Sequence, residues 1–112
     1  MTQAWNYEKM ELIVKKSKQI QKNNEGEVNV LRFLSQNLIV SNWDGKAAIS
    51  YKETLEKYIL EFEQGQTEFV FKGKIYDSIE IVWKMILLLE INILSMKNTD
   101  DLIENKIKGG SF

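Results

Sequence analysis

The sequence predicts an α+β fold, in which an antiparallel sheet of two hairpins packs against a long apolar helix, with further helices at both termini. Two tight-turn dipeptides lie between short segments of strand character, and an 18-residue stretch from Ile79 to Met96 is largely apolar. The 112 residues are 44% hydrophobic and 28% charged, which suits one hydrophobic core. We therefore expect a single domain that spans residues 1–112.

The N-terminal region predicts two helices. Over residues 5–23 the apolar residues fall at helical spacing, and lysines occupy the other side (apolar: Met10, Ile13, Val14, Ile20). A polar turn at 23–26 ends this amphipathic helix. A shorter helix is then expected to end near Gln36, because four large apolar residues lie at positions 30, 31, 33 and 34.

A hairpin is expected over residues 38–51, with its turn at Asp44-Gly45. This dipeptide suits a type I′ turn, which requires positive φ at both central positions. The register pairs Trp43 with Lys46 and places apolar residues on one face in alternation (Leu38, Val40, Ala47, Ile49, Tyr51).

Ser50 and Glu53 have the spacing of a capping box, which predicts that the next helix begins there. Large apolar residues follow at i, i+3, i+4 and i+7, and Gly65 stands where a left-handed C-terminal cap belongs (Leu55, Tyr58, Ile59, Phe62). A second hairpin is expected over 69–76, with its turn at Lys72-Gly73.

The long apolar helix is expected to begin after Asp77, which forms a second cap-and-acid pair with Glu80. Thr99 is predicted to cap a separate short terminal helix. Acidic residues at the start of this helix and lysines at its end suit the helix dipole. The predicted core includes six large residues on the two central helices, so that Leu87→Ala is expected to cost about 2–5 kcal/mol (Leu55, Ile59, Phe62, Trp83, Ile86, Leu87).

The composition restricts the chemistry. The chain contains no cysteine and no histidine, which removes thiolate nucleophiles, the common zinc ligands and His-dependent proton transfer. Phosphate-binding glycine motifs are also absent from the sequence. Asp100-Asp101 is explained as charge at a helix N-terminus rather than as a catalytic carboxylate pair. We therefore expect a protein that is not an enzyme and that needs no cofactor or metal.

The N-terminal residues lack the basic start and the 7–15-residue apolar stretch of a secretory signal. The most apolar stretch is interrupted by Glu80, Lys84 and Glu90, whereas a spanning helix needs about 20 largely uncharged residues. A cytoplasmic protein with no membrane segment is expected.

The charge distribution indicates a surface for a basic partner. Residues 53–68 hold five glutamates and one lysine, and we select Glu56, Glu61, Glu63 and Glu68 as candidate partner-binding residues. The alternative is that these glutamates form a solvated helix face, which affects only solubility and association and does not recognise a specific partner.

Aromatic residues supply the other candidates. Trp43, Asp44 and Tyr51 lie in or near the expected 38–51 hairpin turn, and exposed tryptophan and tyrosine are favoured interface anchors. The alternative is that Trp43 packs under the first helix as part of the core.

The alternative function is that of a regulatory or phage accessory protein that binds nucleic acid through the lysine-rich first helix. The first 24 residues hold five lysines against two glutamates (lysines: Lys9, Lys15, Lys16, Lys18, Lys22). However, Arg32 is the one arginine in the sequence and the net charge is −1, whereas nucleic-acid binders show a strong basic excess.

The segment from Trp43 to Ser78, WDGKAAISYKETLEKYILEFEQGQTEFVFKGKIYDS, resembles the small immunity proteins of bacterial toxin systems, and the contact-dependent growth inhibition kind is the nearest fit. The likeness covers about a third of the chain and lies in the sequence of hairpin, acidic helix and apolar helix. The resemblance implies a cytoplasmic protein that binds one cognate toxin domain, such as a nuclease, and covers its active site or its substrate surface. It implies no functional residue by motif.

Overall fold

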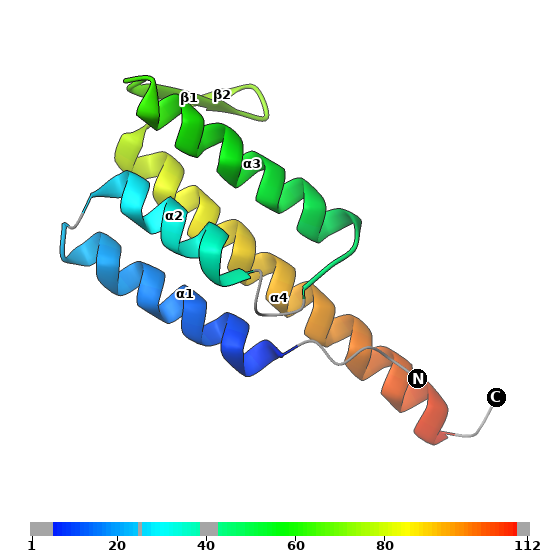
Figure 1. Ribbon diagram of the computed structural model, residues 1–112. Helices are drawn as coiled ribbons and strands as arrows, with labels where there is room; N and C mark the ends of the chain where they lie inside the picture. Colours follow the sequence, from blue (N-terminus) through cyan, green and yellow to red (C-terminus); the bar gives the residue numbers. More distant parts are fainter. Residues whose placement is uncertain (1–5, 25, 39–42, 110–112) are drawn as a thin grey trace.

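The computed structural model describes residues 6–24, 26–38 and 43–109, and over 100–109 it describes the backbone. These residues form four helices and one two-stranded antiparallel sheet (Figure 1), in the order α1 (Tyr7–Lys22), α2 (Glu27–Leu38), α3 (Lys46–Glu63), β1 (Glu68–Phe71), β2 (Lys74–Asp77) and α4 (Ser78–Gly109). The described chain is thus mostly helical with a small sheet, which agrees with the predicted α+β class.

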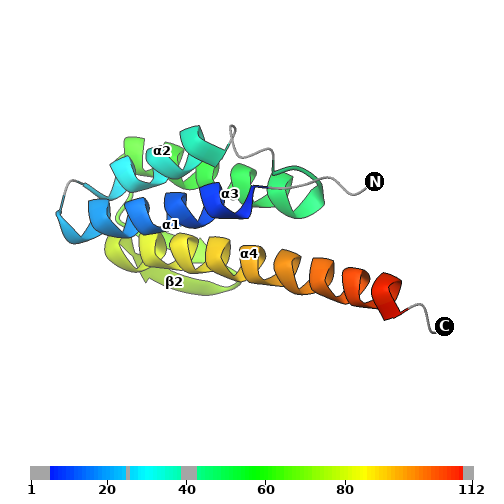
Figure 2. The same ribbon diagram turned by 90° about the horizontal axis from the view of Figure 1, so that it is seen from below.

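α4 is the central element, because it contacts each of the other described helices and both strands. α1 runs antiparallel to α4, as the ion pairs Lys18–Glu90 and Lys97–Glu11 show. Figure 2 shows α1, α2 and α3 on one side of α4, with its C-terminal half continuing beyond the other helices.

The core lies between α4 and the three other helices. α4 contributes its inward residues at helical spacing (Ile81, Val82, Met85, Ile86, Leu89, Ile93), and α2 contributes Val30, Leu31, Leu34 and Leu38. At the end of the bundle near the hairpin, Phe69 of β1 packs against Phe62 and Tyr58, with ring centroids 4.4 and 6.0 Å away. The sheet therefore covers the end of the helical core, and is not a separate layer.

The two N-terminal helices agree with the sequence prediction. α1 begins after Asn6, whose side-chain oxygen accepts a 3.0 Å hydrogen bond from the Lys9 N–H. Its buried face is made of Met10, Ile13 and Val14, as their spacing predicts.

The predicted hairpin over 38–51 is wrong. Residues 46–51 form the first turns of α3, Leu38 ends α2, and 39–42 lie outside the described residues. Gly45 has the positive φ that the prediction required, at +95°. However, it is the N-cap residue of α3 and not part of a hairpin turn. The predicted start of the helix at Ser50 is also wrong, because Ser50 and Glu53 lie inside α3. The helical face Ala48, Tyr51, Leu55 and Tyr58 is the one that α3 buries.

The second hairpin is confirmed. β1 and β2 pair antiparallel with Phe71 opposite Lys74, which leaves Lys72-Gly73 as a two-residue turn. Both turn residues have positive φ, +49° at Lys72 and +79° at Gly73, which is the geometry of a type I′ turn.

The start of α4 is confirmed as a capping box, whereas its predicted end is wrong. Asp77 Oδ1 accepts from the Glu80 N–H at 2.8 Å, and Glu80 Oε1 accepts from the Asp77 N–H at 3.0 Å. No second helix begins at Thr99 in the described chain, since α4 continues unbroken to Gly109. The Thr99 hydroxyl donates to the Ser95 carbonyl at 2.9 Å, which satisfies it within the helix.

Leu87 is an exception to the predicted core. It is 46% exposed, whereas Ile86 and Leu55 are fully buried, and Ile59, Phe62 and Trp83 are half-buried against the core. The apolar run encircles α4, but α1, α2 and α3 cover only one side of it, and the exposed Leu87 points away from that side.

Candidate functional site: a partner-binding surface

The aromatic candidates are core residues. Trp43 and Tyr51 are both buried, with their ring centroids 5.6 Å apart. The expectation that they form an exposed anchor is therefore wrong. The error follows from the hairpin, because Tyr51 lies on the inward face of α3. The alternative of Trp43 as core is correct, and Asp44, beside it, is exposed.

Two buried tyrosines of α3 have structural hydrogen bonds. The Tyr51 hydroxyl donates to the Met85 carbonyl at 2.6 Å, and the Tyr58 hydroxyl donates to the Val70 carbonyl at 2.7 Å. Burial raises the pKa of Tyr51 well above its usual range. Burial, and then the charge of Glu61, raise the pKa of Tyr58 to about 12. Both phenols therefore stay protonated and tie α3 to α4 and to β1.

The three acidic candidates on α3 lie in three different environments. Glu56 is exposed on α3, whereas Glu61 is half-buried beside Tyr58. Glu63 forms an ion pair with Arg32 of α2, in which the guanidinium nitrogen lies 2.6 Å from the carboxylate oxygen. Both side chains remain close to half exposed. This pair fixes the Glu63 carboxylate against α2, so only part of its charge is available to a partner.

Glu68 lies away from α3, on the first residue of β1. It pairs directly with Asp77 across the sheet, and Asp77 shares its capping box with Glu80. Carboxylates directly opposite each other in an antiparallel pair repel. The structure thus places a second, small group of acids at this edge of the hairpin, separate from the α3 acids.

Two exposed apolar residues lie among the α3 acids, and the sequence reasoning missed both. Ile49 is 57% exposed and Leu60 is 54% exposed. Together with Glu53 and Glu56 they recur at i, i+4, i+7 and i+11, so they share one side of α3. We call Ile49, Glu53, Glu56 and Leu60 the α3 face. If the helical spacing of α3 had been extended back to Lys46, it would have placed Ile49 on the exposed side of the helix. The predicted hairpin placed Ile49 in a strand instead.

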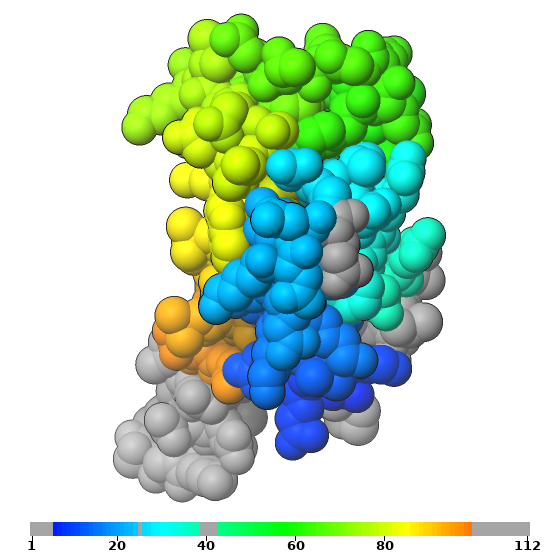
Figure 3. Space-filling view, turned by 90° about the vertical axis from the view of Figure 1, so that its left-hand side faces the viewer, coloured from blue at the N-terminus to red at the C-terminus, as the bar shows by residue number. Residues whose placement is uncertain are grey.

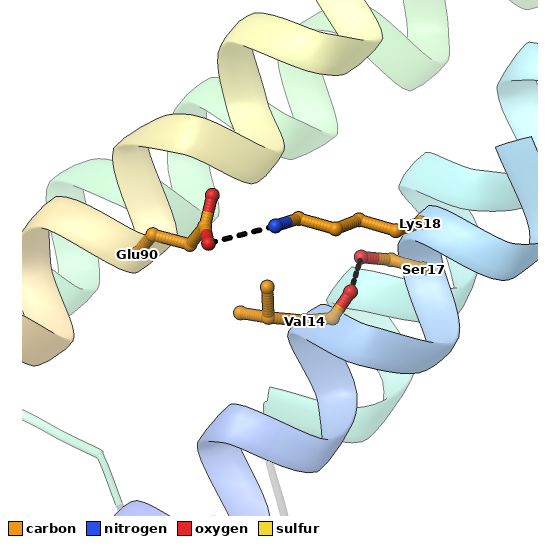
Figure 4. A network of polar contacts seen from close by, with 4 residues as sticks. All are labelled: Val14, Ser17, Lys18 and Glu90. Carbon is orange, nitrogen blue, oxygen red and sulfur yellow. Dashed lines mark hydrogen bonds and ion pairs between the residues drawn. The ribbon is translucent and has the colours of Figure 1, made fainter.

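A groove of about 470 Å³ lies between α1 and α4 on another part of the surface, and Figure 3 shows these helices side by side. Val14, Ile93 and Leu94 supply its apolar lining. The Lys18 ammonium lies 2.9 Å from the Glu90 carboxylate across it, next to a buried Ser17 hydroxyl that donates to the Val14 carbonyl at 2.7 Å (Figure 4).

The residues that line this groove offer amines and carboxylates, without a hydroxyl, thiol or imidazole. Lys97 pairs with Glu11 at 3.2 Å, so two of its three lysines are in ion pairs and Lys15 is the third. Among the described residues, no group of three or more Asp, Glu, His or Cys side chains could hold a metal ion. Within the same residues, no helix combines the length and the apolar character needed to cross a membrane.

Comparison of the chain with protein-family models, with curated proteins and with solved structures finds no match.

Proposed function

We propose that this chain is a protein-binding inhibitor that recognises a basic partner protein through the α3 face, and that its partner is a bacterial toxin domain. The observation that carries this proposal is the exposure of Ile49 and Leu60 on either side of Glu53 and Glu56. Apolar anchors bordered by charge are the usual composition of a protein interface. A cytoplasmic immunity protein that covers the active site or the substrate surface of a nuclease fits this chemistry.

The α3 acids suit a partner that binds nucleic acid. A nuclease presents a basic surface to its substrate, and a carboxylate-bearing helix can occupy that surface. Charges at the rim of such a contact mainly set the association rate, whereas the apolar residues set the dissociation rate. Glu56 and Leu60 should therefore affect different kinetic constants.

Nucleic acid as the partner of the lysine-rich α1 has less support. Lys18 is engaged with Glu90, and Glu8 and Glu11 add negative charge to the same helix. A phosphate-binding surface would present unpaired lysines or arginines in excess.

The test needs a candidate toxin domain, which should be sought in the genes next to the gene of this chain. Binding kinetics of wild type, Glu56→Lys and Leu60→Ala should be measured at low and high salt. We expect Glu56→Lys to slow association at low salt, with the difference shrinking at high salt. Leu60→Ala should speed dissociation by about fivefold or more, the equivalent of a loss of about 1 kcal/mol.

Matched controls exist on α1. Glu8→Lys makes the same change in net charge, and Leu12→Ala truncates a leucine that is 48% exposed, close to Leu60. Both controls should bind as wild type does. If the two control variants weaken binding and the α3 variants do not, the interface lies on α1. Binding of the chain to DNA or RNA with a steep salt dependence, and not to the toxin domain, would refute the proposal.

A further inference from the structure

A second apolar surface runs along the outer side of α4. Trp83, Leu87, Ile91 and Leu94 follow one another at intervals of four, four and three residues, so they share one helix face, which we call the α4 stripe. Trp83 is half-buried, Leu87 is exposed as described above, and Ile91 and Leu94 are 52% and 60% exposed. Figure 2 shows the other helices on the opposite side of α4, and the hairpin lies beside the first half of α4 and borders the stripe there.

Such a surface is unfavourable in water. Each leucine or isoleucine side chain that leaves water on binding contributes favourable free energy in proportion to the apolar area that it buries. A contiguous row of large apolar residues on a small protein marks a contact with another molecule far more often than scattered single residues do.

The border of the α4 stripe is electrically balanced. On the side that faces α1, the two charged α4 residues are each paired within the chain, Glu90 with Lys18 and Lys97 with Glu11. On the other side, the Lys84 ammonium lies 6.0 Å from an aromatic ring centroid of the hairpin. The stripe can therefore meet an equally balanced surface, including its own copy, without bringing together rows of unpaired like charges.

The pattern of the α4 stripe is also symmetric along the helix. The midpoint between Trp83 and Leu94 is at 88.5 and the midpoint between Leu87 and Ile91 is at 89, so the two pairs share a centre to within half a residue. Outside the stripe, Glu80 precedes it and Lys97 follows it at matching distances, with opposite charges. A row of this kind is complementary to itself when two copies run antiparallel, because each residue then meets its counterpart.

We propose that the α4 stripe binds a second copy of this chain, with α4 packed antiparallel on α4 about a two-fold axis near residue 89. Trp83 of each copy then faces Leu94 of the other, and Leu87 faces Ile91. The Glu80 end of one stripe lies toward the Lys97 end of the other, so the charges at the ends attract. Two-fold contacts between identical patches are the commonest form of protein oligomer.

The first measurement is sedimentation equilibrium of the purified full chain over a range of concentrations. Wild type should form a dimer, and a double Leu87→Lys and Ile91→Lys variant should be a monomer. A matched control carries Ile49→Lys and Leu60→Lys, which add the same charge at equally exposed sites on α3. This control should dimerise as wild type does.

A second measurement restores the contact. Because position 87 faces position 91 of the other copy, a variant with lysine at both positions should pair with a variant that has glutamate at both. Each variant alone should be a monomer, since like charges would oppose each other. The equimolar mixture should form a heterodimer, whose stability falls as salt is added.

The orientation is tested with spin labels. The chain has no native cysteine, so Asn98→Cys supplies one label per copy at an exposed site just beyond the stripe. In the antiparallel dimer the two label sites are about 18 residues apart along the axis, or about 27 Å. A parallel arrangement would place them side by side.

Three results would overturn the proposal: a chain that stays monomeric at every concentration, an α3 control that dissociates the dimer as well as the stripe variant does, or labels at position 98 that lie in contact. A monomer whose stripe binds anionic phospholipid vesicles would also overturn it, and would identify a lipid surface instead. All of these experiments use the chain without the toxin domain, so their failure leaves the proposed function untouched.

Discussion

The hydroxyl of Tyr51, on α3, donates a 2.6 Å hydrogen bond to the backbone carbonyl of Met85, in the first half of α4. The two residues are separated by the whole hairpin, and the bond is buried. It joins the helix that carries the proposed recognition surface to the helix at the centre of the core. The position of the α3 face therefore depends on a buried polar contact as well as on apolar packing.

Removing this hydroxyl should destabilise the protein without unfolding it. Tyr51→Phe should lower the free energy of unfolding by about 0.5–1.5 kcal/mol, because it deletes one buried hydrogen bond and keeps the ring. Urea denaturation measures the change. Tyr76→Phe is the control, since the Tyr76 hydroxyl makes no hydrogen bond to a described residue, and it should be close to neutral. An equal loss in both variants would contradict the role assigned to Tyr51.

Alkaline pH should destabilise the fold through the two buried tyrosines. The pKa of Tyr58 rises from 10.0 to about 12 in the folded state, and the pKa of Tyr51 is raised as well. Because the folded pKa values are the higher ones, the contribution to stability is complete below about pH 10 and is lost as the pH rises through about 12. Urea midpoints measured across this range should fall, and they should fall less steeply in Tyr58→Phe. An unchanged slope would show that Tyr58 ionises freely in the folded protein.

Neighbouring residues of α4 should respond very differently to truncation. Ile86→Ala should cost about 2–5 kcal/mol, because Ile86 is buried. Leu87→Ala should cost less than about 1 kcal/mol, since Leu87 lies on the outer side of the helix. Both are measured by denaturation at high dilution, where a dimer would be dissociated. A large loss at Leu87 under those conditions would mean that its side chain is covered within one chain.

The two capping-box sequences should also differ. Asp77→Ala should lower the free energy of unfolding by about 0.5–2 kcal/mol, because Asp77 caps α4. Ser50→Ala should change it by no more than about 0.5 kcal/mol, because Ser50 is an exposed residue within α3. Thermal or urea denaturation of the two variants decides this. Equal losses would imply that α3 begins at Ser50 in solution.

The correct sequence predictions rest on local geometry. The Lys72-Gly73 turn and the Asp77–Glu80 box each involve residues within a few positions of one another, so a short window contains all the information. α1 was predictable for the same reason, because its apolar spacing matches one helix face.

The failures arise where a short window fits two structures. Residues 46–51 alternate as a strand would, yet Ala48 and Tyr51 also begin a helical series that continues through Leu55. The choice between strand and helix depends on α4, because the Met85 carbonyl of α4 accepts a hydrogen bond from the Tyr51 hydroxyl when residues 46–51 are helical. The candidate site suffered the same error, because the strand register placed Ile49 on the apolar face, whereas α3 exposes Ile49 and buries Tyr51.

The central place of α4 has a consequence for how the chain is made. Because α4 contacts every other described element and follows all of them in the sequence, the ribosome synthesises it after α1, α2, α3 and the hairpin. During that interval the inward faces of the three earlier helices have no α4 to pack against, and they remain exposed to water and to chaperones. The cooperative core can close only after residues 81–93 have left the exit tunnel, so the three earlier helices must wait for α4 before they can complete their packing.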